Sequence, residues 1–235
     1  MFDAIMRQAA DASTLNFDAL DTVARNVSNL NTWGYKGQRF HMYLSDEQTV
    51  KTADVRDMEE GELMLTKRTL DVGVQGQGFI QITRPDGETA YTRFGSMTQN
   101  GDGFLTTPFG DLIGTGIQLP TNYHKIRIDR QGHVKLMEKP GDQYRTIGQI
   151  PLVNFPNPAA LENIGYNSFQ ETDDSGKPVR ASEATQLSQG YLERANVDIH
   201  LAVTEVLRIN AGALSNLRLV KLIDQLYQEA VNLRQ

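Results

Sequence analysis

The sequence contains no cysteine. Disulfide bonds, thiol nucleophiles and thiolate metal sites are therefore excluded as explanations of its fold or chemistry. No apolar run is long enough to span a bilayer, so we expect no direct membrane insertion. The amino-terminal residues have no basic stretch followed by a continuous apolar segment, and we therefore expect no cleaved secretory signal.

Positive charge is also scarce. The 23 Lys and Arg residues are outnumbered by 29 Asp and Glu residues, which gives a formal net charge of −6. No run of Lys or Arg exceeds two residues, so nucleic acid is not expected as a partner. The hydrophobic content of 39% lies in the range of globular chains and excludes general disorder.

The residue patterns of common active sites are missing as well. The four histidines are scattered and do not show the helical spacing of a metal site. The turns at 102–103 and 173–176 lack the alternating oxygen ligands and the closing Glu of a calcium loop. The glycine-rich segment 73–78 is followed by a strand-like pattern, whereas a nucleotide site needs a helix there. We therefore expect no enzyme activity, no cofactor and no metal.

Glycine and proline are absent from the first 33 residues, where apolar or small residues recur at spacings of three and four. This pattern predicts an amphipathic helix with a heptad-like seam, ending near Gly34, whose positive φ would cap it. A second helical pattern runs from about Val197 to Gln235. Only Gly212 interrupts it, and we expect a kink or close packing there. The apolar stripe of this second helix is wide enough to contact more than one neighbour.

The middle of the chain, from about Thr69 to Thr185, carries most of the glycine and proline. Short alternating runs separated by turn signals predict an antiparallel β-domain there. Residues 125–136 are predicted to form one hairpin, and 73–78 the turn of another. Residues 37–68 are predicted to be an extended connector with some strand character.

These patterns predict an α+β protein, in which the two terminal helices pair as a coiled-coil-like core and the antiparallel β-domain is inserted between them. The predicted divisions are an amino-terminal helix in 1–36, the connector in 37–68, the β-domain in 69–185 and a carboxy-terminal helix in 186–235.

Three asparagines, Asn26, Asn29 and Asn31, fall in the last two turns of the first predicted helix. Asparagine is a poor helix former because its amide competes for backbone groups. We expect these amides to bond either neighbouring chains or the chain that leaves the helix. The alternative is that they only fray the helix end into a turn.

Three segments, in order, resemble the motifs of flagellar axial proteins. The first is 20–36, which ends in Asn-Thr-Trp-Gly-Tyr-Lys. The second begins at 70–79 and continues through 85–95, and the third is 189–197, with the sequence Gln-Gly-Tyr-Leu-Glu-Arg-Ala-Asn-Val. Within that family, length and the glycine-rich strand motif are similar to rod proteins of the proximal and distal type. The last helix departs from the family pattern at 207–214.

The resemblance implies a structural subunit of the flagellar basal-body rod in the periplasm. Its partners would be copies of itself, other rod and hook proteins, and the flagellar type III export apparatus. The subunits would form a helical tube that transmits torque and encloses the export channel. Alternatives left open are a hook-type axial protein, an oligomeric β-domain that binds peptide or glycan, and an enzyme.

Two sets of residues carry the prediction. The expected subunit contacts are Val23, Asn26, Val27, Asn29, Leu30, Asn31, Val220, Ile223 and Tyr227. The glycines expected at structural turns are Gly34, Gly76, Gly78 and Gly190.

Overall fold

The computed structural model describes residues 2–44 and 50–232, with side chains described for 11–43 and 51–232 except 224, 227, 230 and 231. The contacts divide the chain into two compact units. Unit 1 comprises residues 1–28, 38–55 and 197–235, and unit 2 comprises 29–37 and 56–196. The predicted connector is therefore divided between the units. Residues 186–196, predicted with the carboxy-terminal helix, belong to unit 2.

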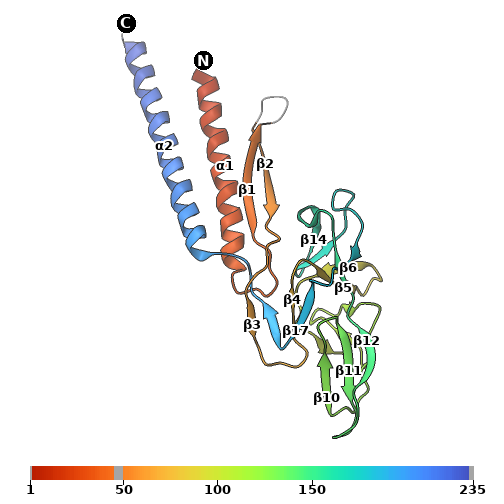
Figure 1. Cartoon of the computed structure of the whole chain (residues 1–235). Coiled ribbons are helices and arrows are strands. Elements are labelled where there is room, and N and C mark those ends of the chain that lie inside the picture. Colours follow the sequence, from red (N-terminus) through yellow and green to blue (C-terminus); the bar gives the residue numbers. More distant parts are fainter. Residues whose placement is uncertain (1, 45–49, 233–235) are drawn as a thin grey trace. The chain divides into compact units, whose positions relative to one another are not determined.

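Unit 1 is built from two long helices and two strands (Figure 1). The helices are α1 (Phe2–Ser28) and α2 (Ile199–Asn232), which confirms a helix near each end of the chain. The strands β1 (Gln38–Leu44) and β2 (Val50–Arg56) pair as a two-stranded sheet. The strand character predicted for the connector is thus confirmed.

The two helices of unit 1 lie side by side and run in opposite directions (Figure 1). Ala19 and Val23 of α1 are buried against Ile209 of α2. Further along, Gly212 faces α1, because a Cβ atom built there would lie 4.0 Å from Oδ1 of Asn16. The helix α2 continues through this glycine as one element.

The end of α1 differs from the prediction. The helix ends at Ser28, and the N–H of Thr32 donates to the carbonyl of Asn29 at 2.9 Å in the turn that follows. Gly34 has the expected positive φ, 68°, but it lies beyond this turn. Its N–H donates to the carbonyl of Glu193 at 2.7 Å. The prediction that Gly34 caps the helix is therefore wrong, although the residue does lie in a turn with positive φ.

Unit 2 is an antiparallel β structure, as predicted. Its largest sheet has the order β14-β15-β6-β5-β9-β8-β7, with β13 and β16 attached through β5; a second has the order β10-β11-β12, and two pairs are β17-β4 and β18-β3. The strands are β3 (Leu63–Leu65), β4 (Val72–Gln75), β5 (Phe79–Thr83), β6 (Thr89–Thr92), β7 (Thr98–Gln99), β8 (Leu105–Thr106), β9 (Leu112–Ile113), β10 (Lys125–Ile128), β11 (His133–Met137), β12 (Arg145–Gln149), β13 (Leu152–Asn154), β14 (Glu162–Gly165), β15 (Ser168–Gln170), β16 (Val179–Arg180), β17 (Gln186–Gln189) and β18 (Tyr191–Glu193). A short 3-10 helix, η1 (Pro158–Ala160), precedes β14.

One of the two predicted hairpins is present. Strands β10 and β11 pair with Ile128 opposite Val134, and their alternating apolar side chains point inward. The hairpin predicted around 73–78 is wrong, because β4 pairs with β17 whereas β5 pairs with β6, β9 and β13. Gly76, with a φ of 89°, turns the chain from one sheet into another.

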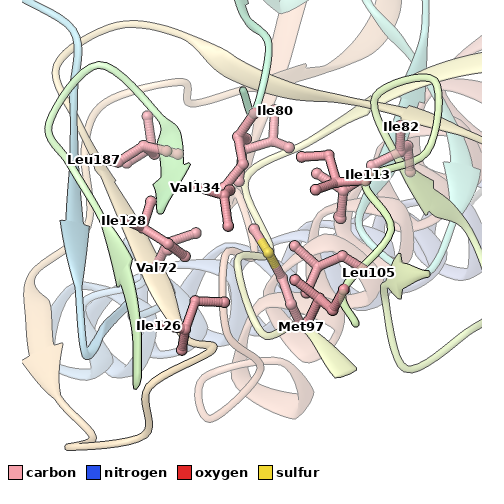
Figure 2. Close-up of a cluster of buried hydrophobic side chains, with 14 of the residues drawn as sticks. Val72, Ile80, Ile82, Met97, Leu105, Ile113, Ile126, Ile128, Val134 and Leu187 are labelled. Carbon is pink, nitrogen blue, oxygen red and sulfur yellow. The ribbon is translucent and has the colours of Figure 1, made fainter. Parts of the chain in front are cut away.

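The interior of unit 2 is a large aliphatic cluster to which strands of several sheets contribute (Figure 2). A second cluster is aromatic: Phe79 meets Phe155 and Phe169 edge-on, with ring centroids 5.9 and 5.8 Å apart. Each fully buried aliphatic or aromatic side chain contributes roughly 1.5–3 kcal/mol. The aliphatic cluster consists of Val72, Val74, Ile80, Ile82, Ala90, Met97, Leu105, Ile113, Ile117, Leu119, Ile126, Ile128, Val134, Leu136, Ile150 and Leu187.

We predict that Gly95→Ala destabilises unit 2 by about 3 kcal/mol or more, since overpacking forces the backbone to shift. A Cβ atom at this position would lie 1.7 Å from the carbonyl oxygen of Val72. Urea unfolding followed by circular dichroism measures the change. In the matched control Gly101→Ala the added methyl meets open space, and we expect a change within about 0.5 kcal/mol. Equal effects of the two substitutions would contradict the close approach.

Candidate assembly site

A single buried carboxylate, that of Glu193, joins three distant parts of unit 2. Its Oε1 accepts from Nζ of Lys36 at 2.8 Å and from the N–H of Gly61 at 2.7 Å. Its Oε2 accepts from Nε of Arg93 at 2.6 Å. The side chains of Lys36 and Glu193 are 0% exposed and that of Arg93 is 2% exposed. We call Lys36, Arg93 and Glu193 the ionic junction.

Arg93 extends the junction into the glycine-rich segment. Its guanidinium donates to the carbonyls of Val74 at 3.0 Å, Gly76 at 3.1 Å and Gly78 at 2.8 Å. Gly78 has no positive φ, but a Cβ there would lie 2.8 Å from Cγ2 of Thr185. Gly78 is therefore required by close packing and not by the turn that was predicted. The fork geometry of arginine suits this set of acceptors, which a single ammonium group does not match.

Lys36 is the second cation of the junction. Burial lowers the pKa of Lys36 below its usual value of 10.5, the nearby charge of Arg93 lowers it further, and the carboxylate of Glu193 opposes both. The ammonium also donates to the carbonyl of Glu59 at 2.5 Å. The three groups that donate to the carboxylate of Glu193 belong to Lys36, Gly61 and Arg93. All three residues lie far from Glu193 in sequence.

Asn196 fastens the backbone close to three of the points where the chain passes between units. Its Nδ2 donates to the carbonyls of Asp57 at 2.9 Å and Glu59 at 3.0 Å, and its Oδ1 accepts from the N–H of Gly37 at 2.7 Å. The N–H of Asp57 also donates to the carbonyl of Gly37 at 2.8 Å. One amide therefore holds three chain segments together within unit 2.

The ionic junction is the place where the three family-like motifs meet. Lys36 closes the first motif, Arg93 lies in the second, and Glu193 and Asn196 lie in the third. Gly190, predicted as a turn residue, has a φ of 80° and directs the chain from β17 into β18. The three motifs thus supply the contacts that hold the distant segments of unit 2 together.

In unit 1, Asn26 ties the helix α1 to the strand β1. Its Nδ2 donates to the carbonyl of Gln38 at 2.7 Å, and its Oδ1 accepts from the N–H of the same residue at 2.8 Å. The side-chain amide thereby exchanges two hydrogen bonds with the backbone of one residue, as a residue of a neighbouring antiparallel strand would. Of the three possibilities offered for the asparagines, Asn26 follows the one in which the amide bonds the chain leaving the helix.

The helix α2 exposes two apolar stripes. They lie on either side of the line that carries Ile209, since residues three, four and seven apart share one side of a helix. The first stripe consists of Ile199, Val203, Val206, Leu207, Leu214 and Leu217, and the second of Leu201, Leu219, Leu222 and Leu226. Exposed apolar surface of this extent usually marks an interaction site.

The predicted subunit contacts fall into two groups. Val23 is 8% exposed and packs within its own chain, as does the amide of Asn26, so the structure gives both an internal role. Asn29 accepts from the hydroxyl of Thr32 at 3.2 Å. The other predicted contacts are at least partly accessible to solvent. Val27 and Asn31 are exposed, and Leu30, Val220 and Ile223 are half-buried. The side chain of Tyr227 lies outside the described residues.

The residues of the ionic junction were missed as functional positions. Lysine and arginine are rarely buried unless they are paired, and nothing local distinguishes Lys36 or Arg93 from a surface residue. The available signal was the presence of a charged residue inside each of the three motifs.

Within residues 2–44 and 50–232, no His, Asp and Glu side chains form a group of three or more that could hold a metal ion. Over the same part of the chain, no helix combines the length and apolar character needed to cross a bilayer.

Comparison with known proteins identifies the class first. A family model described as the flagellar hook protein FlgE/F/G D1 domain matches residues 73–136. This segment includes most of the large sheet of unit 2 together with β10 and β11. The matched part of unit 2 is therefore similar to a domain of flagellar hook and rod proteins.

Whole-chain relatives then give the family. The flagellar basal-body rod protein FlgG of Caulobacter vibrioides is 31% identical over 97% of this chain and 98% of the relative. FlgG of Buchnera aphidicola subsp. Baizongia pistaciae is 30% identical, with 96% of both chains covered. FlgG of Agrobacterium fabrum is 30% identical, with 95% of both covered. The chain belongs to the family of flagellar basal-body rod proteins.

This family membership defines a structural subunit of the bacterial flagellar basal-body rod in the periplasm. The matched relatives are structural rod proteins rather than enzymes.

We predict that Arg93→Lys destabilises unit 2 by about 3 kcal/mol or more, because breaking a buried pair leaves charged and polar groups uncompensated. Lysine cannot reach Glu193 and the three carbonyls together. Chemical denaturation measures the loss. Arg84→Lys is the control, since Arg84 lies at the surface with Nη1 3.6 Å from Asp86, and a change within about 0.5 kcal/mol is expected there. A mild effect at position 93 would argue against the junction.

The lowered pKa of Lys36 predicts a pH dependence. The folded chain binds this proton less tightly than the unfolded chain, so the charged lysine opposes folding at lower pH. That cost disappears as the pH rises through the folded pKa toward 10.5. The free energy of unfolding of the wild type should therefore rise relative to Lys36→Met over this range. Chemical denaturation at several pH values measures this difference. For the control Lys125→Met, at an exposed position, the free energy of unfolding should change with pH in parallel with the wild type. A Lys36→Met curve parallel to the wild type would refute the lowered pKa of Lys36.

Proposed function

We propose that the exposed stripes of α2, together with Val27 of α1, are the surfaces through which copies of this chain stack in the rod. The observation that carries the proposal is the row of exposed leucines along α2. Burying each of them against a neighbour would contribute roughly 1.5–3 kcal/mol. Two stripes on one helix allow contacts with two neighbours, and a head-to-tail arrangement that does not close grows as a helical tube.

The terminal helices are the proposed wall of this tube. In our proposal α1 and α2 pair as a coiled-coil-like core, for which the cluster of Ala19, Val23 and Ile209 and the approach of Gly212 to Asn16 provide support. Val220 and Ile223 continue the line of Ile209 toward the end of α2 and would be covered in the same arrangement. The half-burial of Leu30 and the exposure of Asn31 leave both available for contacts.

The proposed assembly is mechanical in function. A rigid helical tube would transmit torque, and its lumen would serve as the export channel. Its partners would be copies of itself and the adjoining rod and hook proteins. We further propose delivery by the flagellar type III export apparatus as an unfolded chain, which fits a chain that needs no disulfide to fold.

The test is Val27→Asp. Val27 is 42% exposed, so an aspartate there should leave the separate chain folded. In a stacked tube the same carboxylate would be buried without a partner, which is strongly unfavourable. We expect loss of rods in basal bodies viewed by electron microscopy and loss of swimming, with the circular dichroism spectrum and unfolding midpoint of the purified protein unchanged.

Two controls accompany this variant. Val27→Thr keeps the shape without a charge and should assemble. Val179→Asp adds the same charge at a 52% exposed position of β16 in unit 2 and should also assemble. Normal rods containing the Val27→Asp chain would overturn the proposal.

A further inference from the structure

We propose that unit 2 cannot become stable until residues 186–196 are present, so that in a chain made from its amino terminus this unit remains unfolded until those residues have been added. We call residues 186–196 the closing segment. The inference rests on the proposed function in one respect: delivery as an unfolded chain gives the delay a purpose. Its physical basis is independent of that.

The first argument is charge. Lys36 and Arg93 precede Glu193 by 157 and 100 residues, and both end up buried. Before the closing segment exists, folding would bury two cations without the carboxylate that accepts from both. An uncompensated buried charge is strongly destabilising. The early part of unit 2 therefore has an electrostatic reason to remain hydrated and unfolded.

The second argument is strand pairing. The closing segment supplies β17, the partner of β4, with Leu187 opposite Val74. It also supplies β18, the partner of β3, with Leu192 opposite Met64. Among the described residues, β4 and β3 have no other strand partner. Without the closing segment both would leave a row of backbone groups unpaired.

The third argument is packing. Leu187 belongs to the main aliphatic cluster and Leu192 is 3% exposed. The N–H of Leu187 also donates to the carbonyl of Arg130 at 2.9 Å, which ties the closing segment to the β10–β11 turn. The closing segment therefore contributes counter-ion, strand partners and core side chains at once.

The order of synthesis converts this arrangement into a delay. Chains are made from the amino terminus, and domains can fold as they emerge. Residues 29–185 exist first, yet they lack the groups just described. The last of these groups, on Glu193 and Arg194, become available only when the closing segment has been made. Folding of unit 2 is thereby postponed until the chain has been made as far as residue 196, where unit 2 ends.

Native-state hydrogen exchange on the full-length wild-type protein tests the inference. The closing segment has two reporters: the N–H of Gly190, bonded to Asp71, and that of Arg194, bonded to Glu62. The body of unit 2 has the N–H of Gln81, bonded to Pro151, and that of Leu105, bonded to Ile117. If unit 2 requires its closing segment, all four amides exchange through one opening, with equal protection and equal dependence on low concentrations of denaturant.

The contrary result is equally distinct. Should Gly190 and Arg194 exchange about tenfold faster or more, through an opening that leaves Gln81 and Leu105 protected, unit 2 would be stable without its closing segment. The inference would then be overturned. Because the wild type alone decides this, a variant that failed to fold would not leave the question open.

Glu193→Gln adds a second measurement. We expect exchange at all four amides to accelerate together, by about 100-fold or more, because the junction loses its only carboxylate. The matched control is Glu183→Gln, the same change at an exposed position ten residues upstream, which should leave all four rates unchanged. Acceleration confined to Gly190 and Arg194 would contradict the inference. Exchange should be unaffected in Val27→Asp, so this result and the fate of the assembly proposal are separable.

Discussion

The carboxylate of Glu193 is the interaction on which unit 2 depends. Two buried cations and one backbone N–H converge on its two oxygens, from positions that the sequence keeps far apart. Burying such charges is costly, and good geometry with full hydrogen bonding is what offsets that cost. The observed register of β18 against β3 places Glu193 where it meets both Lys36 and Arg93.

The two units differ in how they are held together. Unit 2 has extensive aliphatic and aromatic clusters, whereas the cluster described in unit 1 has three buried members, Ala19, Val23 and Ile209. Ordering a helix residue costs about 1–2 kcal/mol of backbone entropy, which so small a cluster offsets only in part. Isolated helices are marginal in water for the same reason. In the assembly that we propose, contacts with neighbouring subunits would supply the rest of the stabilisation.

Sequence patterns were sufficient where the structure is local. The two helices follow from spacings of three and four, and the 125–136 hairpin from alternation around a turn. They failed where partners are distant: the 73–78 segment resembles a hairpin turn, yet β4 takes its partner from β17, far along the chain. The ionic junction was beyond reach for a related reason. Lys36 is buried because it pairs with Glu193, and no residue close to Lys36 in the sequence indicates that partner.

The pairing of Asn26 with Gln38 has a mechanical consequence. Because one side-chain amide is bonded to both the N–H and the carbonyl of Gln38, α1 and the start of β1 cannot rotate or slide independently without breaking two hydrogen bonds. Twisting of α1 about its axis is therefore passed directly to the β1–β2 sheet. Asn26 thus couples the helix to the strand mechanically. Such a coupling suits a subunit of a structure that is loaded in rotation.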